Sequence, residues 1–127
     1  MNRARQGGGR VFVIAGPSGS GKTTIYKRLL KEEAGINFSV SATTRAPRER
    51  ECDGQDYYFI SREEFFRRRS AGEFVEWAEV HGNYYGTLRE ELSRKSAAGQ
   101  VCVLDVDVQG AASLRQGGLD ADFIFIV

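Results

Sequence analysis

The sequence predicts an α/β fold, because short apolar runs rich in β-branched residues alternate along the chain with segments of helix-forming residues. The 127 residues are enough for one domain with its own core. Hydrophobic residues make up 41% and charged residues 28%, as in ordinary globular proteins, so the composition excludes a disordered or collagen-like chain.

The charge balance limits the partners that we expect. The 18 basic and 17 acidic side chains leave a net charge of +1, without the positive excess that nucleic-acid-binding proteins use against phosphates. We therefore expect no nucleic-acid partner, and any bound anion must be held by local side chains. Cys52 and Cys102 are far apart and the sequence shows no signal peptide or membrane-spanning run, so we expect a cytoplasmic protein without membrane contact.

The first elements form a strand, a loop and a helix. Residues 1–10 are basic and glycine-rich without periodicity, and we expect them to be a flexible N-terminus. Residues 11–14 form an apolar, β-branched run and predict a strand. A glycine-rich loop follows, and the helix formers at residues 22–34 predict a helix that ends at Gly35.

An insert with strands and helices of its own comes next. Residues 37–41 alternate like a strand, residues 57–60 predict another, and a polar, arginine-rich loop at residues 43–56 lies between them. Ser61 and Glu64 have the spacing of a capping box, which predicts a short helix that ends at the next glycine.

The insert continues with a strand and a second helix. Residues 74–80 alternate, which would place Phe74 and Glu76 on one face of the strand. Thr87 and Glu90 repeat the capping-box spacing, and they predict that another helix begins there.

The last elements return to the first sheet. Residues 101–107 form an apolar run that ends in Asp105 and Asp107, which is typical of a strand buried on both faces of a parallel sheet. A helix at residues 109–116 and a strand at residues 123–127 complete the alternation. Because the chain stops on an apolar strand, we expect it to be cut short. The predicted organisation is a core of residues 11–36 and 93–127 and an insert of residues 37–92.

Residues 16–23 match the phosphate-loop pattern G-x-x-x-x-G-K-[ST] in full, between an apolar strand and a helix. Glycines in such a loop permit torsions that turn N–H groups toward phosphate oxygens, and the helix N-terminus adds partial positive charge. Lys22 would reach the β- and γ-phosphates, and the Thr23 hydroxyl would bind the Mg²⁺ that bridges them. The predicted triphosphate-binding residues are Gly16, Pro17, Ser18, Gly19, Ser20, Gly21, Lys22, Thr23 and Thr24.

Asp105 has two readings, a partner of the magnesium ion or a carboxylate that caps a loop. The phosphate loop by itself fits a GTPase, an ATPase motor or a small-molecule kinase. Residues 41–48 bear on this choice, because the forked guanidiniums of Arg45 and Arg48 suit a phosphate dianion. An ordinary solvated loop is the other reading of these arginines.

Several motifs, in order and with matching spacing, resemble guanylate kinase. They are the phosphate loop and the segments SATTRAPR, DGQDYYF, FVEW, GNYYG and LDVDVQG. The resemblance implies a three-layer parallel sheet core of the P-loop NTPase type, with an inserted mixed β/α subdomain that binds GMP. It also implies a lid and a C-terminal part of the core that this sequence does not contain.

The resemblance further implies a reaction and a role for each site residue. With Mg²⁺, the γ-phosphoryl group of ATP is transferred to GMP, and the products are ADP and GDP. Guanine presents N1–H and an N2 amino group beside the O6 acceptor, so its pocket needs a carboxylate and hydroxyl donors. The implied GMP-binding residues are Glu76 for N1 and N2, Ser41, Thr87 and Asp107 for the base, and Arg45, Arg48, Tyr57 and Tyr85 for the phosphate. Lys22 and Arg45 are the implied catalytic residues, and Thr23 and Asp105 the implied magnesium ligands.

Two other functions compete with the kinase. A guanylate-kinase-like interaction module would bind proteins without catalysis, but such modules typically have degraded phosphate loops, and here Gly16, Gly21 and Lys22 are intact. A GTPase switch has less support, because the sequence has no N-K-x-D-type stretch for reading the base.

Overall fold

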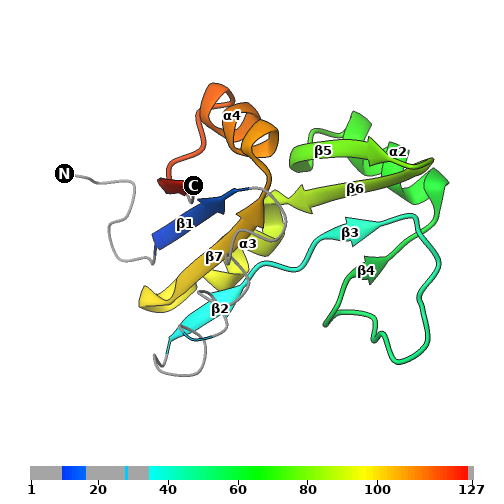
Figure 1. Cartoon of the computed structure of the whole chain (residues 1–127), viewed down its shortest axis with the longest axis horizontal. Helices are drawn as coiled ribbons and strands as arrows, with labels where there is room; N and C mark the ends of the chain where they lie inside the picture. The colour runs from blue at the N-terminus through cyan, green and yellow to red at the C-terminus, as the bar shows by residue number, and fades with distance from the viewer. Residues whose placement is uncertain (1–9, 17–27, 29–34, 126–127) are drawn as a thin grey trace. The chain divides into compact units, whose positions relative to one another are not determined.

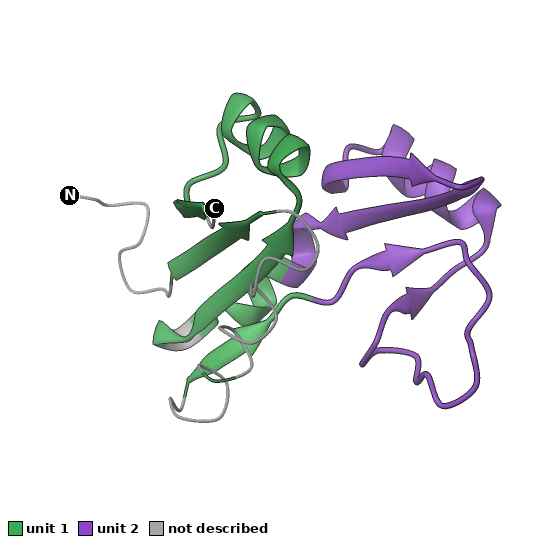
Figure 2. Ribbon diagram, viewed as in Figure 1, with its two compact units in different colours: residues 1–39, 92–127 green, residues 40–91 purple. Residues whose placement is uncertain are grey.

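The computed structural model describes residues 10–16, 28 and 35–125. Residues 1–9, 17–27, 29–34 and 126–127 lie outside this description. They include nearly all of the predicted N-terminal segment, most of the phosphate loop and most of the first predicted helix. The chain divides into two compact units, Met1–Ser39 with Leu92–Val127 (unit 1) and Val40–Glu91 (unit 2) (Figure 2). Each unit contains one four-stranded sheet.

The sheet of unit 1 is parallel throughout and has the strand order β2-β7-β1-β8 (Figure 1). The central strands β1 and β7 are mostly apolar, and Val13, Cys102 and Leu104 are almost completely buried. Strands buried on both faces in this way are typical of parallel sheets, so the predicted α/β core is confirmed. The strands are β1 (Arg10–Ala15), β2 (Ile36–Phe38), β7 (Val101–Val106) and β8 (Asp122–Phe125).

A helix follows β7 and covers part of this sheet. In α4 (Val108–Gln116), Ala111 and Leu114 are buried, and the helix contacts β1 and β7. Asp107 is the N-cap, because its side chain accepts a hydrogen bond of 2.7 Å from the Gly110 N–H. The strand predicted to reach residue 107 therefore ends at Val106, where the backbone turns to begin the helix.

The start of β1 corrects the predicted extent of the N-terminal segment. Arg10 was expected in the flexible part, but it is the first residue of the strand and lies opposite Val101. Its guanidinium donates a hydrogen bond of 2.8 Å to Asp122, the first residue of β8. Pairing with β7 and this ion pair draw Arg10 into the sheet.

The sheet of unit 2 is mixed, with the order β4-β3-β6-β5. One of its faces packs on α2 (Arg62–Ser70), where Phe65 is fully buried and stacks on Phe74 with 4.4 Å between ring centroids. The predicted cap of this helix is confirmed, since the Ser61 hydroxyl accepts a hydrogen bond from the Glu64 N–H. The strands are β3 (Ala42–Thr43), β4 (Tyr58–Phe59), β5 (Phe74–Val80) and β6 (Asn83–Leu88).

Strand β6 was not predicted, and the helix after it starts later than predicted. Thr87 lies in β6 rather than at a helix cap, because its hydroxyl is used across the strand pair, where it donates to Glu76. The helix α3 begins at Arg89 (Arg89–Lys95) and is followed by the short 3₁₀ helix η2 (Ala97–Gly99). Thr87 and Glu90 therefore have the spacing of a capping box without forming one, and the prediction that a helix begins at Thr87 is wrong.

An irregularity in β5 corrects the predicted faces of that strand. Phe74 lies opposite Leu88, whereas Glu76 lies opposite Thr87, so two steps along β5 match one step along β6. Such a bulge reverses the alternation of side chains. Phe74 consequently packs on α2 while Glu76 is on the other face of the sheet, and the prediction that they share a face is wrong.

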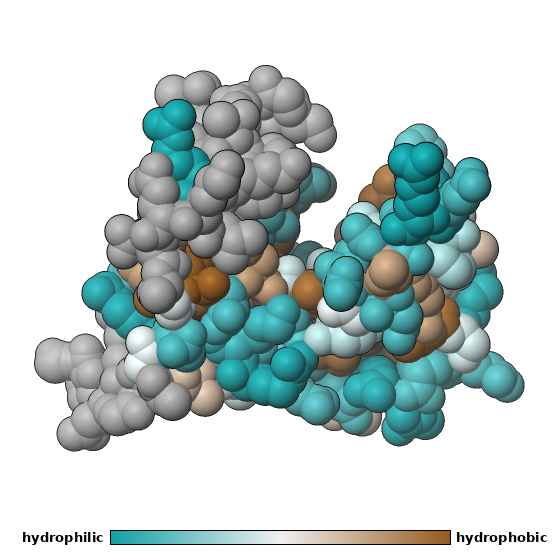
Figure 3. Space-filling model, turned by 90° about the horizontal axis from the view of Figure 1, so that it is seen from below, coloured by the Kyte–Doolittle hydropathy of each residue, from teal (hydrophilic) through white to brown (hydrophobic). Residues whose placement is uncertain are grey.

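Polar side chains cover most of the described surface in the view of Figure 3, with smaller apolar patches between them. None of the described helices is long and apolar enough to cross a lipid bilayer.

Candidate nucleotide-binding site

The sheet of unit 2 has one polar face, formed by the side chains of Glu76, Tyr85 and Thr87. Glu76 lies opposite Thr87, and Tyr85 opposite Ala78, so the register places all three on the side away from α2. Burial of Phe65 and Phe74 on the opposite side holds the sheet in this orientation. The apolar packing of one face thus fixes which side chains the other face presents.

Glu76 and Thr87 form a hydrogen-bonded pair. The Thr87 hydroxyl donates to the Glu76 carboxylate at 2.8 Å, and Thr87 itself is fully buried. Because a threonine hydroxyl has one hydrogen to donate, this bond uses it and fixes the direction of the carboxylate. In this structure Thr87 therefore orients Glu76, and its oxygen is left with acceptor capacity only.

A second group, which we call the arginine cluster, consists of Arg45, Glu51, Tyr57, Phe59 and Tyr85. The Arg45 guanidinium lies over the rings of Tyr57 and Phe59, 5.1 and 6.0 Å from their centroids. Tyr57 and Tyr85 meet edge to face at 5.9 Å. Tyr85 belongs to both groups, so the arginine cluster adjoins the polar face.

Arg45 is held by two hydrogen bonds from its Nη1 and Nη2 to the Glu51 carboxylate, each 3.0 Å long. Its side chain is 11% exposed. These bonds raise the pKa of Arg45 above its ordinary value, with smaller contributions from the Tyr57 and Tyr85 hydroxyls. In turn Arg45, followed by the Arg48 N–H, lowers the pKa of Glu51 below its usual range, so both partners are charged at neutral pH.

Two other predicted GMP-binding residues lie in the same unit. Ser41 directly precedes β3, and its carbonyl accepts a hydrogen bond from the Tyr58 N–H. Arg48 is exposed, and its backbone N–H donates to Glu51 at 2.7 Å. Asp107, by contrast, belongs to unit 1, where its carboxylate caps α4.

Little of the predicted triphosphate site falls within the described residues. Gly16 follows β1, whereas Pro17, Ser18, Gly19, Ser20, Gly21, Lys22, Thr23 and Thr24 lie outside. Asp105 is exposed near the end of β7, opposite Ile14 of β1, which shortly precedes Gly16. A carboxylate at this edge of the sheet has the oxygen donors that Mg²⁺ prefers. Among the described residues no group of three or more His, Cys, Asp or Glu side chains could hold a metal by itself, so other ligands would be needed.

Sequence reasoning missed two carboxylates that organise unit 2. Glu51 lies in the arginine-rich loop, where no periodicity marks a residue as important. Glu91 is buried at 1% exposure in α3, and it accepts hydrogen bonds of 2.7 Å from the Val40 N–H and from the Tyr58 hydroxyl. A glutamate among other charged residues at the start of a helix gives no sign of such burial.

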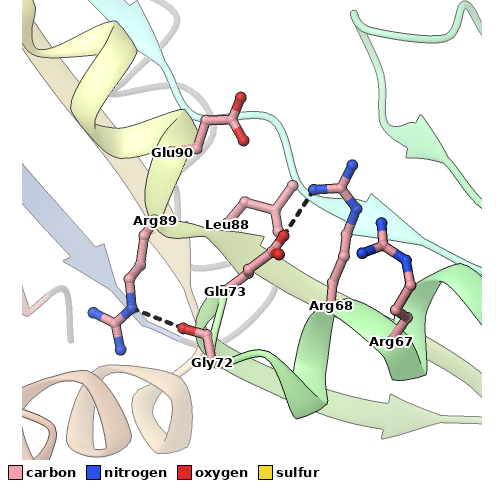
Figure 4. Close-up of a pocket in the computed structure, with 7 residues that line it drawn as sticks. All are labelled: Arg67, Arg68, Gly72, Glu73, Leu88, Arg89 and Glu90. Atoms are coloured by element: carbon pink, nitrogen blue, oxygen red, sulfur yellow. Dashed lines mark hydrogen bonds and ion pairs between the residues drawn. The ribbon is translucent and has the colours of Figure 1, made fainter.

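Unit 2 also contains a cavity of about 430 Å³ that none of the predicted site residues lines (Figure 4). Two of its arginines already have partners, since Arg68 donates to Glu73 at 3.0 Å and Arg89 to the Gly72 carbonyl at 3.1 Å. We therefore assign it no nucleotide. The cavity is lined by Arg67, Arg68, Gly72, Glu73, Leu88, Arg89 and Glu90.

A parallel sheet with a phosphate-loop sequence after its first strand, together with a separate mixed sheet, defines a nucleotide-binding α/β protein of the P-loop class. The chain belongs to the guanylate kinase family, whose sequence model matches residues 8–127. The resemblance seen in the motifs is thereby confirmed.

Individual relatives agree with this assignment. Guanylate kinases of Symbiobacterium thermophilum and Thermotoga maritima are 53% and 51% identical to the chain over 94% and 93% of its length. A crystal structure of guanylate kinase from Anaplasma phagocytophilum matches 94% of the chain at 40% identity, with a TM-score of 0.72. The chain spans 56% and 57% of the length of the two curated relatives, and 60% of the solved structure.

Proposed function

We propose that the protein is an ATP:GMP phosphotransferase that forms ADP and GDP. The observation that carries this proposal is the arrangement in unit 2, where the Glu76–Thr87 pair and the arginine cluster adjoin one another at Tyr85. A carboxylate suits the guanine edge, and an arginine beside tyrosine hydroxyls suits a phosphate. The two groups together match the two ends of GMP.

Glu76 would select guanine by accepting hydrogen bonds from N1–H and the N2 amino group. Since Thr87 already donates to one carboxylate oxygen, the direction of the Glu76 carboxylate would be fixed before the base binds. Adenine places an acceptor nitrogen where guanine has N1–H, and it would leave the carboxylate without a partner, which is costly in a desolvated site. Ser41 and Asp107 would add contacts to the base.

The phosphate of GMP would be held by Arg45, Arg48, Tyr57 and Tyr85. Arg45 would bind it as a fixed fork, because its guanidinium is already oriented by Glu51. Arg48, whose side chain is exposed, would supply a second positive charge. The tyrosines would donate neutral hydrogen bonds.

The triphosphate of ATP would be bound by Gly16 and the residues that follow it in the phosphate loop, with Lys22 on the β- and γ-phosphates. Thr23 and Asp105 would hold a magnesium ion, which when bound neutralises charge on these phosphate oxygens. Lys22 and Arg45 would stabilise the charge that spreads over the transferred phosphoryl group during in-line transfer. Most of the catalysis would then come from positioning rather than from a covalent intermediate.

We also propose that the protein acts on these small molecules in the cytoplasm, without a nucleic-acid or membrane partner. Both cysteines of the chain, Cys52 and Cys102, are free, which supports a reducing compartment. The net charge of +1 supports the absence of a nucleic-acid partner.

A coupled assay with Mg²⁺, ATP and GMP tests the proposal. We expect GDP and ADP to form in equal amounts, and AMP in place of GMP to be a poor acceptor. If GMP binds by calorimetry but no GDP forms in the full-length protein, the chain is an interaction module. If neither binding nor transfer occurs, the assignment of the polar face is wrong.

A further inference from the structure

The carboxylate of Glu51 contacts both arginines that the proposed function assigns to the phosphate of GMP. It accepts hydrogen bonds from Nη1 and Nη2 of Arg45, each 3.0 Å long, and one of 2.7 Å from the backbone N–H of Arg48. The Glu51 N–H in turn donates to the Arg48 carbonyl at 3.0 Å. One acidic side chain therefore determines both the direction of a guanidinium and the path of the loop that carries the second arginine.

These contacts determine which part of Arg45 faces a ligand. A guanidinium has five N–H groups. Nη1 donates to Glu51 and to the Ala46 carbonyl, at 3.0 and 3.1 Å, and Nη2 uses one hydrogen for Glu51. Nε–H and the second Nη2–H make no bond to Glu51 or Ala46, and the Tyr57 ring and the hydroxyls of Tyr57 and Tyr85 beside the guanidinium limit how the group can turn.

Electrostatics and positioning predict opposite effects of Glu51 on GMP. A carboxylate beside a phosphate dianion repels it, so by charge alone Glu51 should weaken binding. A guanidinium fixed before binding loses less conformational freedom when the ligand arrives, so by positioning Glu51 should strengthen binding. The bidentate geometry and the 11% exposure of the Arg45 side chain indicate that the orientation is tightly set before any ligand binds.

We propose that Glu51 is a positioning residue for the phosphate of GMP, and that it acts through Arg45. This role rests on the proposed function. Glu51 does not touch the substrate, and its negative charge is retained because the preset orientation of Arg45 outweighs the repulsion. Removal of the charge should therefore weaken the binding of GMP, even though the site becomes more positive.

The first test needs no ligand. Rotation about the Nε–Cζ bond normally averages the Nη–H resonances of an arginine, whereas a bidentate ion pair keeps them separate. We expect resolved Nη–H resonances of Arg45, assigned by their loss in Arg45→Lys, in the parent protein and in Glu49→Gln. Glu49 lies in the same loop and is exposed, so this variant removes an equal charge. In Glu51→Gln the resonances should average, and unchanged resonances would overturn the proposal.

The second test measures GMP affinity by calorimetry in the same proteins. Glu51→Gln should weaken GMP about tenfold, while Glu49→Gln should stay within about twofold of the parent. Glu51→Asp keeps the charge but shortens the reach, so it should fall between them, and it serves in place of Glu51→Gln if that variant does not fold. Affinity equal to or tighter than that of the parent would show that repulsion dominates, and would overturn the proposal.

A double substitution separates action through Arg45 from a general effect on the loop. In an Arg45→Ala background, Glu51→Gln should change GMP affinity less than about twofold, because the orienting bonds no longer exist. A full tenfold loss in that background would overturn the role through Arg45.

A parent protein with the expected Arg45 resonances but no GMP binding would overturn the proposed function, and with it the phosphate role of Glu51. If the parent binds GMP but the Arg45 resonances are the same in Glu51→Gln as in the parent, only the Glu51 proposal is overturned.

Discussion

The central strands of unit 1 are buried along both faces, whereas the sheet of unit 2 packs one face on α2 and presents polar side chains on the other. In unit 1 this produces near-continuous apolar runs, such as that of β7, where Cys102 to Leu104 are buried. In unit 2, β5 carries Phe74 for the core and Glu76 for the polar face, and a bulge separates them. The comparison shows that the buried strands of unit 1 keep continuous apolar runs, whereas the unit 2 sheet, which presents specific polar side chains, needs a break in its regular alternation.

The comparison predicts that substitutions in the two units separate transfer from GMP recognition. Lys22→Ala, in the phosphate loop of unit 1, should lower the rate of phosphoryl transfer about a thousandfold, because the lysine would stabilise charge on the transferred group. GMP affinity should stay nearly unchanged. Steady-state kinetics and calorimetry measure the two effects, with Lys31→Ala as a control that removes the same charge further along the chain. A comparable loss of GMP affinity in Lys22→Ala would contradict the assignment of phosphoryl transfer and GMP recognition to separate units.

In unit 2 the second largest effect should come from the polar face. Glu76→Gln replaces an acceptor by an amide that would place a donor against N1–H or N2, so GMP affinity should fall about a hundredfold and ATP affinity little. Glu79→Gln is the matched control, because Glu79 lies in the same strand, opposite Tyr84 on the α2 side. Equal losses of GMP and ATP affinity, or equal effects of the two variants, would remove Glu76 from the base pocket.

The same difference between the sheets explains how much of the fold could be predicted from the sequence. The strands predicted at 11–14 and 101–107 match β1 and β7 to within one residue at each end, because burial on both faces leaves a nearly unbroken apolar signal. The helix predicted at 109–116 matches α4 to within one residue as well. Strand β6 was missed because Gly86 and the adjacent tyrosines show no period of two. Its glycine is required by packing, since a Cβ at this position would lie 2.7 Å from Cδ1 of Phe74.

The candidate site was predictable in residue type but not in pairing. Motif resemblance named Arg45, Glu76 and Thr87, and these remain predictions for the bound state. It could not show that the Thr87 hydroxyl is used by Glu76, or that Arg45 is held by Glu51. Both contacts depend on how a loop and a bulged strand bring side chains together, and no local sequence pattern encodes that.

A smaller effect is expected from Gly86→Ala, because Gly86 packs on Phe74 of the apolar face and lies close to the backbone of Glu76, whose side chain is on the polar face. Gly86→Ala places a methyl group against Phe74 and 3.0 Å from the Glu76 carbonyl, so it should lower the free energy of unfolding by about 1–3 kcal/mol. Because the strain falls on the bulge, GMP affinity should fall as well. Chemical denaturation and calorimetry measure both effects. In a Phe74→Ala background Gly86→Ala should cost less, and an undiminished cost there would show that Phe74 is not the group it meets.

The smallest effect is expected on the exposed side of α2, away from the polar face. Glu64 pairs with Arg67 at 2.6 Å and with Arg68 at 2.8 Å, and these bonds lower the pKa of Glu64 below its ordinary value of 4.5. A carboxylate with a lowered pKa stabilises the fold fully above its unfolded pKa, and this contribution is lost as the pH falls through the lower, folded value.

Thermal denaturation against pH checks this prediction. Above pH 4.5, Glu64→Gln should lower the melting temperature by no more than a few degrees, because water screens exposed ion pairs, and the difference from the parent should shrink as the pH falls below 4.5. Glu63→Gln removes a charge from the same helical turn without these ion pairs and serves as the control. A difference that grows toward low pH would have the wrong sign for this mechanism. Loss of GMP affinity in Glu64→Gln would contradict the separation of the two faces, because Glu64 belongs to the helix that packs on the apolar one.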